Sequence, residues 1–135
     1  MLRKNAKIEL IKRVPLFQRC SGRELAAVAA LADEIDLPAG RKLTSEGKTG
    51  KEFVVLVEGV ADVTRKGKAV NKLGPGDFLG EIALVTGRPR TATVTTRTPA
   101  RLLVIAAPAF RSLLRDMPAM QAKVLEAVAE RLPAD

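Results

Sequence analysis

The chain has 135 residues, one cysteine and no histidine, and 23 basic against 15 acidic residues give it a formal net charge of +8. Without imidazole, Ser-His-Asp and Cys-His catalytic arrangements and the usual zinc and haem ligand sets are missing, so most hydrolase, protease and metalloenzyme functions are disfavoured. The length suits one domain, and a lone Cys20 without an internal disulfide fits a reducing compartment. The longest uncharged apolar runs, Leu25–Ala32 and Leu102–Phe110, fall far short of the roughly 20 residues that span a bilayer, so a cytoplasmic protein is expected.

The first third of the chain is predicted to be helical, over residues 8–37. Ser21 and Glu24 have the spacing of a capping box, which marks a helix N-terminus. Apolar residues then recur at helical spacing as far as Ile35, and Pro38 with Gly40 is expected to end the helix.

The middle of the chain, residues 41–106, changes to a strand-like pattern. Turn residues separate short β-branched or alternating segments near 41–45, 53–57, 60–65, 69–73, 91–96 and 101–105. Arg65 to Lys68, with Gly67, predicts the tip of a hairpin. Many short strands at regular spacing favour an antiparallel β-roll of the jelly-roll type.

Residues 108–132 return to a helical pattern. Pro108 suits an early helical position, and Pro118 begins a second helix with an apolar stripe. The predicted fold is therefore a single α+β domain over residues 1–135, in which helices flank an antiparallel β-roll at both ends.

One segment, residues 76–94, interrupts the strands and carries the chemistry. Glu81 to Val85 reads as a short helix between Gly80 and Gly87. Its useful feature is its N-terminus, where free backbone N–H groups and the helix dipole favour an anion. Gly80 has no Cβ to keep a ligand away from the backbone.

Glu81 and Arg90 refine this prediction. Arg90 follows a proline-fixed turn and could return to the helix N-terminus as a bidentate phosphate clamp. Glu81 would repel a phosphate but could accept a hydrogen bond from a sugar hydroxyl. The alternatives are a salt bridge between the two residues, or a first-turn role for Glu81 at the helix dipole. Together the residues favour a phosphorylated sugar as ligand.

The same segment resembles the phosphate-binding cassette of the cyclic nucleotide-binding domain family, the cAMP and cGMP sensors of protein kinase A regulatory subunits, catabolite activator proteins and cyclic-nucleotide-gated channels. The resemblance rests on Phe78 to Leu84 followed by Pro89 to Val94. The glycine framework of the family is also matched, and the resemblance covers residues 10–132; the matching positions are Glu46-Gly47, Gly50, Glu58-Gly59 and Gly74 to Phe78. The loop after Gly47 departs from the family pattern because Lys48 and Lys51 replace its frequent acidic residues.

The resemblance implies a role for each site residue. Glu81 would bind the ribose 2′-hydroxyl and Arg90 the cyclic phosphate, while Gly80 and the backbone near Ile82, Ala83 and Thr91 would complete the phosphate site. The base pocket would be lined by Val63, Val70 and Leu73 and covered by Leu125, Val128 or Leu132 of the last helix. For the three strand residues, ordinary core packing is an equal alternative. The Thr91 hydroxyl suits a cGMP contact, but Thr91 also suits a plain strand position.

The expected function is a non-enzymatic sensor of cAMP, cGMP or both, with no metal or cofactor and with rearrangement of the C-terminal helix about Pro118 as its output. A nucleotide-independent protein interaction module of the same fold is the alternative. Nucleic-acid binding is disfavoured because the basic residues are spread along the chain and only 3% of residues are aromatic. The effector, the ligand preference, a fusion to further domains and a homodimeric state stay open at this point.

Overall fold

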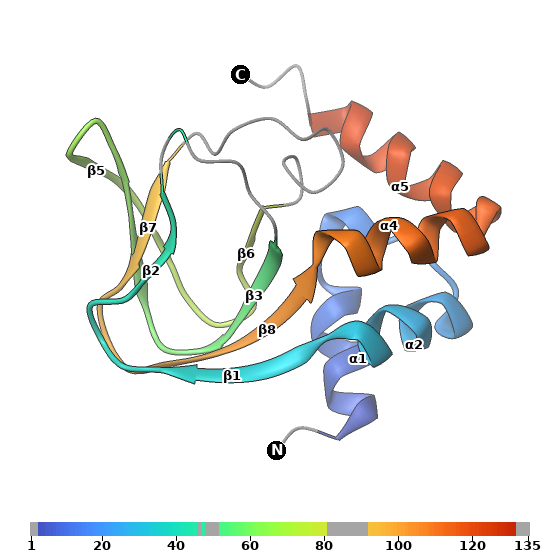
Figure 1. The fold of residues 1–135 in the computed structure, drawn as a ribbon, viewed down its shortest axis with the longest axis horizontal. Helices are drawn as coiled ribbons and strands as arrows, with labels where there is room; N and C mark the ends of the chain where they lie inside the picture. The colour runs from blue at the N-terminus through green and yellow to red at the C-terminus, as the bar shows by residue number, and fades with distance from the viewer. Residues whose placement is uncertain (1–2, 46, 48–51, 81–91, 132–135) are drawn as a thin grey trace.

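The computed structural model describes residues 3–45, 47, 52–80 and 92–131. Helices gather at one end of the molecule and strands at the other (Figure 1). The helical elements are α1 (Lys4–Lys12), the 3-10 helix η1 (Pro15–Phe17), α2 (Gly22–Leu31), α4 (Ala107–Asp116) and α5 (Pro118–Arg131). The predicted helix starts at Pro108 and Pro118 are confirmed to within one residue.

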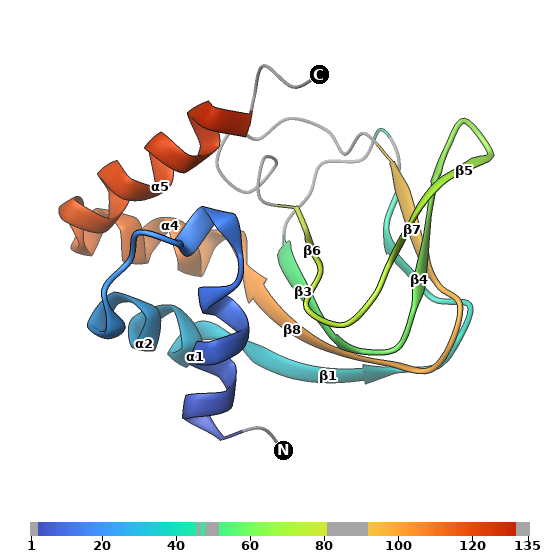
Figure 2. The same cartoon turned by 180° about the vertical axis from the view of Figure 1, so that it is seen from behind.

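The strands form two antiparallel sheets, which confirms the predicted β-roll. The first has the order β1-β8-β3-β6 and the second β2-β7-β4-β5. The bounds are β1 Asp33–Leu37, β2 Lys42–Thr44, β3 Glu52–Glu58, β4 Ala61–Arg65, β5 Lys68–Leu73, β6 Phe78–Leu79, β7 Thr93–Thr96 and β8 Ala100–Ala106. Strand β5 lies at the edge of the second sheet and projects away from the helices (Figures 1 and 2).

The predicted helical region over residues 8–37 is wrong at its C-terminal end. Helix α2 ends at Leu31, and residues 33–37 form β1, which pairs with β8 so that Ile35 lies opposite Leu102. The roll therefore begins at residue 33 instead of 41. Here pairing to a distant strand overrides a local helical spacing, and the Asp36 carboxylate of β1 accepts a 2.9 Å hydrogen bond from Arg101 of β8.

Two local predictions are confirmed in detail. At the start of α2 the Ser21 hydroxyl accepts a hydrogen bond from the backbone N–H of Glu24, and the Glu24 carboxylate accepts one from the Ser21 N–H. At the tip of the β4–β5 hairpin, Lys66 and Gly67 have φ angles of 53° and 78°. Two consecutive positive φ values are the signature of the tight turn that matches strand twist.

The main core lies between the helices and the first sheet. The ring of Phe17 meets those of Phe53 and Phe110 edge-on, with centroids 5.7 Å apart in each pair. Helix α5 adds Met120 and Val124, both fully buried, to the same core. The helices therefore cover one sheet and leave the inner face of the other to surround a cavity.

Candidate functional site

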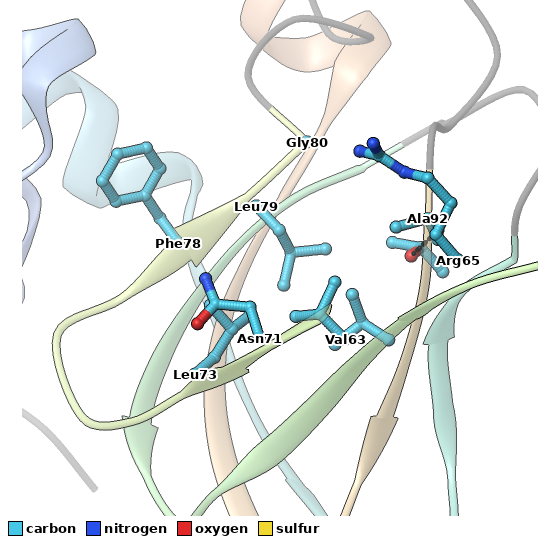
Figure 3. Close-up of a pocket in the computed structure, with 10 residues that line it drawn as sticks. Val63, Arg65, Asn71, Leu73, Phe78, Leu79, Gly80 and Ala92 are labelled. Carbon is cyan, nitrogen blue, oxygen red and sulfur yellow. Dashed lines mark hydrogen bonds between the residues drawn. The ribbon is translucent and has the colours of Figure 1, made fainter. Parts of the chain in front are cut away.

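A cavity of about 260 Å³ opens inside the roll, between β6 of the first sheet and the strands of the second sheet (Figure 3). Five of its ten lining residues are aliphatic and three carry polar side chains, and a mixture of apolar walls and a few polar groups is usual for a small-molecule site. It is lined by Thr44, Val63, Arg65, Asn71, Leu73, Phe78, Leu79, Gly80, Ala92 and Val94.

The β4–β5 hairpin supplies one wall. Its register places Val63 opposite Asn71 and Ala61 opposite Leu73. Because side chains alternate between the faces of a strand, Asn71 and Leu73 of β5 share the inward face. Val63 and Leu73, two of the residues predicted for the base pocket, both line this cavity (Figure 3).

A tight turn positions the opposite wall. The Asp77 carboxylate accepts a hydrogen bond from the Gly74 N–H at 2.7 Å. The backbone of Leu56 in β3 bonds to both Gly76 and Asp77, which sets β6 against β3. The strand ends at Gly80, whose φ of 95° is accessible to glycine at little cost.

The described residues on either side of 81–91 both line the cavity. Gly80, where β6 ends, and Ala92, where the chain enters β7, both line it. The Thr44 hydroxyl of β2 donates a 3.1 Å hydrogen bond to the Ala92 carbonyl and fixes that end. The described residues on both sides of 81–91 therefore line the same cavity.

Comparison with known proteins agrees with this geometry. A family model described as the cyclic nucleotide-binding domain matches residues 34–117. The chain belongs to the cyclic nucleotide-binding domain family. The resemblance stated from the sequence is therefore confirmed.

The relatives of this cyclic nucleotide-binding domain include a channel and transcriptional regulators. A "Cyclic nucleotide-gated potassium channel" of Rhizobium etli is 32% identical over 123 residues, which are 91% of this chain and 34% of the channel. A "CRP-like cAMP-activated global transcriptional regulator" of Mycobacterium tuberculosis is 27% identical over 129 residues, 92% of this chain and 58% of the regulator. The chain thus spans from a third to just over half of these relatives. The N-terminal domain of a transcriptional regulator from Streptomyces coelicolor A3(2) superimposes with a TM-score of 0.82 at 30% identity, covering 93% of each chain.

Five predicted ligand contacts of the cyclic nucleotide-binding domain lie outside the described residues, together with the predicted short helix. They are Glu81, Ile82, Ala83, Arg90 and Thr91. Of the predicted phosphate site, Gly80 alone is described, and it lies at the cavity rim.

Val70, which was predicted to line the base pocket, does not line the cavity. Its side chain is 54% exposed and does not line the cavity. The register of the hairpin skips Val70: Asn71 lies opposite Val63 and Ala69 opposite Thr64, so Val70 has no partner in β4, whereas Asn71 and Leu73 line the cavity. Sequence reasoning chose the aliphatic Val70 for the pocket and missed its polar neighbour Asn71, which lines the cavity.

The lid residue Leu125 is also away from the cavity. Helix α5 turns Met120, Val124 and Ala127 into the main core and leaves Leu125 49% exposed. Val128 lies in the same helix, but its side chain is outside the described structure, as is Leu132. Leu125 therefore does not line the cavity in the roll.

Sequence reasoning missed three polar cavity residues: Thr44, Arg65 and Asn71. Stepping by two from Val63 reaches Arg65, and stepping back by two from Leu73 reaches Asn71, so strand periodicity could have found both. The Asn71 amide is oriented by its own oxygen, which accepts a 2.8 Å hydrogen bond from the Lys72 N–H. Arg65 extends along the cavity wall near Ala92 (Figure 3).

We also searched the described residues for a metal site, a reactive thiol and a membrane-spanning helix. No group of three His, Cys, Asp or Glu side chains there could hold a metal ion. Partial burial, reinforced by the Glu24 carboxylate, raises the pKa of the Cys20 thiol, which disfavours a reactive thiolate. None of the described helices is long and apolar enough to cross a membrane.

Proposed function

We propose that this domain is a regulatory sensor that binds cAMP or cGMP in the cavity of the roll and catalyses no reaction on it. The observation that carries the proposal is that Gly80 and Ala92, the described residues on either side of residues 81–91, both line the cavity. Two relatives are named for a response to cyclic nucleotides, one of them specifically to cAMP. These names support a cyclic nucleotide as the ligand class.

The cavity would hold the purine. Val63, Leu73 and Leu79 offer apolar contacts to the faces and edge of a base. The Asn71 amide carries both a donor and an acceptor, the pair that the N7 and N6 edge of adenine requires. Thr91 supports the opposite preference, because its hydroxyl could bridge the phosphate and the amino group of guanine.

The segment 81–91 would hold the cyclic phosphate and the ribose. Arg90 would form charge-assisted hydrogen bonds to the phosphate, each stronger than a neutral one. Glu81 would accept the ribose 2′-hydroxyl. Arg90 would thus bind the phosphate and Glu81 the ribose, and the base would lie in the cavity, whose lining includes one charged side chain, Arg65.

Calorimetric titration with cAMP, cGMP and the linear monophosphates tests the proposal. Wild type should bind a cyclic nucleotide, and Arg90→Leu should abolish measurable binding because a buried anion would lose its charged partner. Arg88→Leu is the matched control, since it removes the same charge from the same segment and should bind like wild type. Glu81→Ala should weaken binding substantially.

Each outcome bears on the assignment. Equal affinity in wild type and Arg90→Leu would contradict the phosphate site. A wild type that binds neither cyclic nucleotide would favour the alternative of a nucleotide-independent interaction module.

The output would be a rearrangement of α5. The Lys123 ammonium lies 2.7 Å from the buried Glu24 carboxylate of α2, and Arg19, between η1 and α2, lies 3.3 Å from Glu126, so two ion pairs join α5 to the N-terminal helices. To cover the base, α5 would have to exchange these contacts for the cavity rim, with Pro118 as the hinge. A ligand can drive this exchange only if it binds the closed form more tightly.

Spin labels would detect this rearrangement. In a Cys20→Ser background, labels at Arg23→Cys on α2 and Gln121→Cys on α5 should change their separation when a saturating cyclic nucleotide is added. Labels at Arg23→Cys and Lys12→Cys, both on N-terminal helices, provide the control and should not. An unchanged α2–α5 distance would contradict the proposed output.

A further inference from the structure

A second hollow, of about 610 Å³, lies between α4 and α5. Helix α5 folds back over α4, and the two helices contact each other (Figures 1 and 2). The hollow is lined by Pro108, Arg111, Ser112, Leu114, Arg115, Gln121 and Leu125. It shares no lining residue with the cavity in the roll, so its function is a separate question.

One face of α4 gives the hollow its charge. Pro108, Arg111, Ser112 and Arg115 follow each other at spacings of three, one and three residues, which places them on one side of a helix. The Arg115 guanidinium donates a 3.0 Å hydrogen bond to the Ser112 hydroxyl. In the described parts of the chain, neither Arg111 nor Arg115 forms an ion pair.

The floor of the hollow is apolar. Leu114 is 8% exposed, and Leu125, on the opposite helix, is 49% exposed. Leu125 is one of three large hydrophobic residues classed as exposed in the described structure. The groove thus combines an exposed leucine with two guanidinium groups that form no ion pair among the described residues.

We infer that this hollow, the α4–α5 groove, binds an acidic amphipathic helix of a partner protein. Charge complementarity selects this occupant: carboxylates one helical turn apart on the partner would match Arg111 and Arg115, which are themselves one turn apart on α4. An aliphatic side chain on the same face of the partner would cover Leu114 and Leu125, as in other helix-in-groove complexes. A second copy of this chain, at +8, would meet the groove with charge of the same sign.

The test is a ¹⁵N-HSQC titration of the full chain with a synthetic helical peptide that carries two glutamates one turn apart and a leucine on the same face. Chemical-shift changes should concentrate on α4 and α5, and the same peptide with glutamines should bind at least about tenfold more weakly. Arg111→Gln with Arg115→Gln should weaken binding by a similar factor, and Leu125→Ala by less.

The matched control is Arg23→Gln with Arg41→Gln, which removes the same charge from exposed positions elsewhere and should leave the peptide affinity unchanged. No shift changes at about 1 mM peptide, or equal affinities in the two double variants, would overturn the inference. So would preferential binding of anionic vesicles or duplex DNA through the same residues, since these belong to other classes of partner.

Discussion

The two sheets of the roll differ in what covers them. In the first sheet, β3 and β8 are buried along most of their length, and the helices pack against one face. In the second, β5 is exposed at five of its six residues and β4 is half-buried. One sheet supports the domain, whereas the other keeps its inward face available for a ligand. Stability and binding should therefore respond to different residues.

The largest expected effect is on the supporting side. Phe17→Ala would remove a fully buried ring that contacts Phe53 and Phe110, and it should lower the free energy of unfolding by about 3–5 kcal/mol. Denaturant unfolding measures the change. Val70→Ala, on the exposed strand, is the control and should change the free energy by less than about 0.5 kcal/mol. Similar losses in both would remove the distinction between the sheets.

The next effect is on the binding side. Asn71→Leu keeps the size of the side chain but removes the amide from the cavity, so it should weaken cyclic nucleotide binding about tenfold and leave the free energy of unfolding nearly unchanged. Val70→Leu, its neighbour on the opposite face, should alter neither quantity. Calorimetry and denaturant unfolding on the same samples give the affinity and the free energy of unfolding. A loss of affinity in Val70→Leu would contradict the assignment of Asn71 to the cavity and of Val70 to the outside.

The smallest effect is the pH dependence of the helical end. The Lys123 hydrogen bond, followed by the backbone N–H of Ser21, lowers the pKa of the Glu24 carboxyl. A lowered pKa in the folded state means that the ionised carboxylate stabilises the fold above its unfolded pKa of about 4.3, and that this contribution is lost as the pH falls through the folded pKa.

Glu24→Gln should therefore flatten the acid limb of the stability curve. Glutamine can still close the capping box, so the variant removes the charge and keeps the cap. Urea unfolding from about pH 6 to pH 3 should show a smaller loss of stability in the variant than in wild type. Asp33→Asn, an exposed carboxylate, is the control and should follow the wild-type curve.

The sequence predicts most elements because their signals are local. The capping box at Ser21, the prolines at 108 and 118 and the turn at Gly67 each depend on neighbouring residues, and the structure has all of them. The family cassette is a motif of contiguous residues, so it too can be recognised without a structure.

The sequence-based predictions are wrong where contacts between residues far apart in the chain determine the local structure. Ile35 has helical spacing to α2 but lies in β1, because β8 offers a pairing partner nearly 70 residues away. Strand β6 is only two residues long and exists through its pairing with β3. Val70 and Asn71 differ by one position, and only the register of the hairpin decides which of them faces the cavity.

The exposed edge strand β5 also bears on how the domain behaves at high concentration. An unpaired edge presents backbone N–H and C=O groups that could recruit the same strand from another molecule. Lys68 and Lys72 are both exposed on this strand, and the approach of a second copy would bring their like charges together. Part of the net charge of +8 thus protects the sheet from growing beyond one molecule, and replacing both lysines with threonine should lower the concentration at which the protein begins to aggregate.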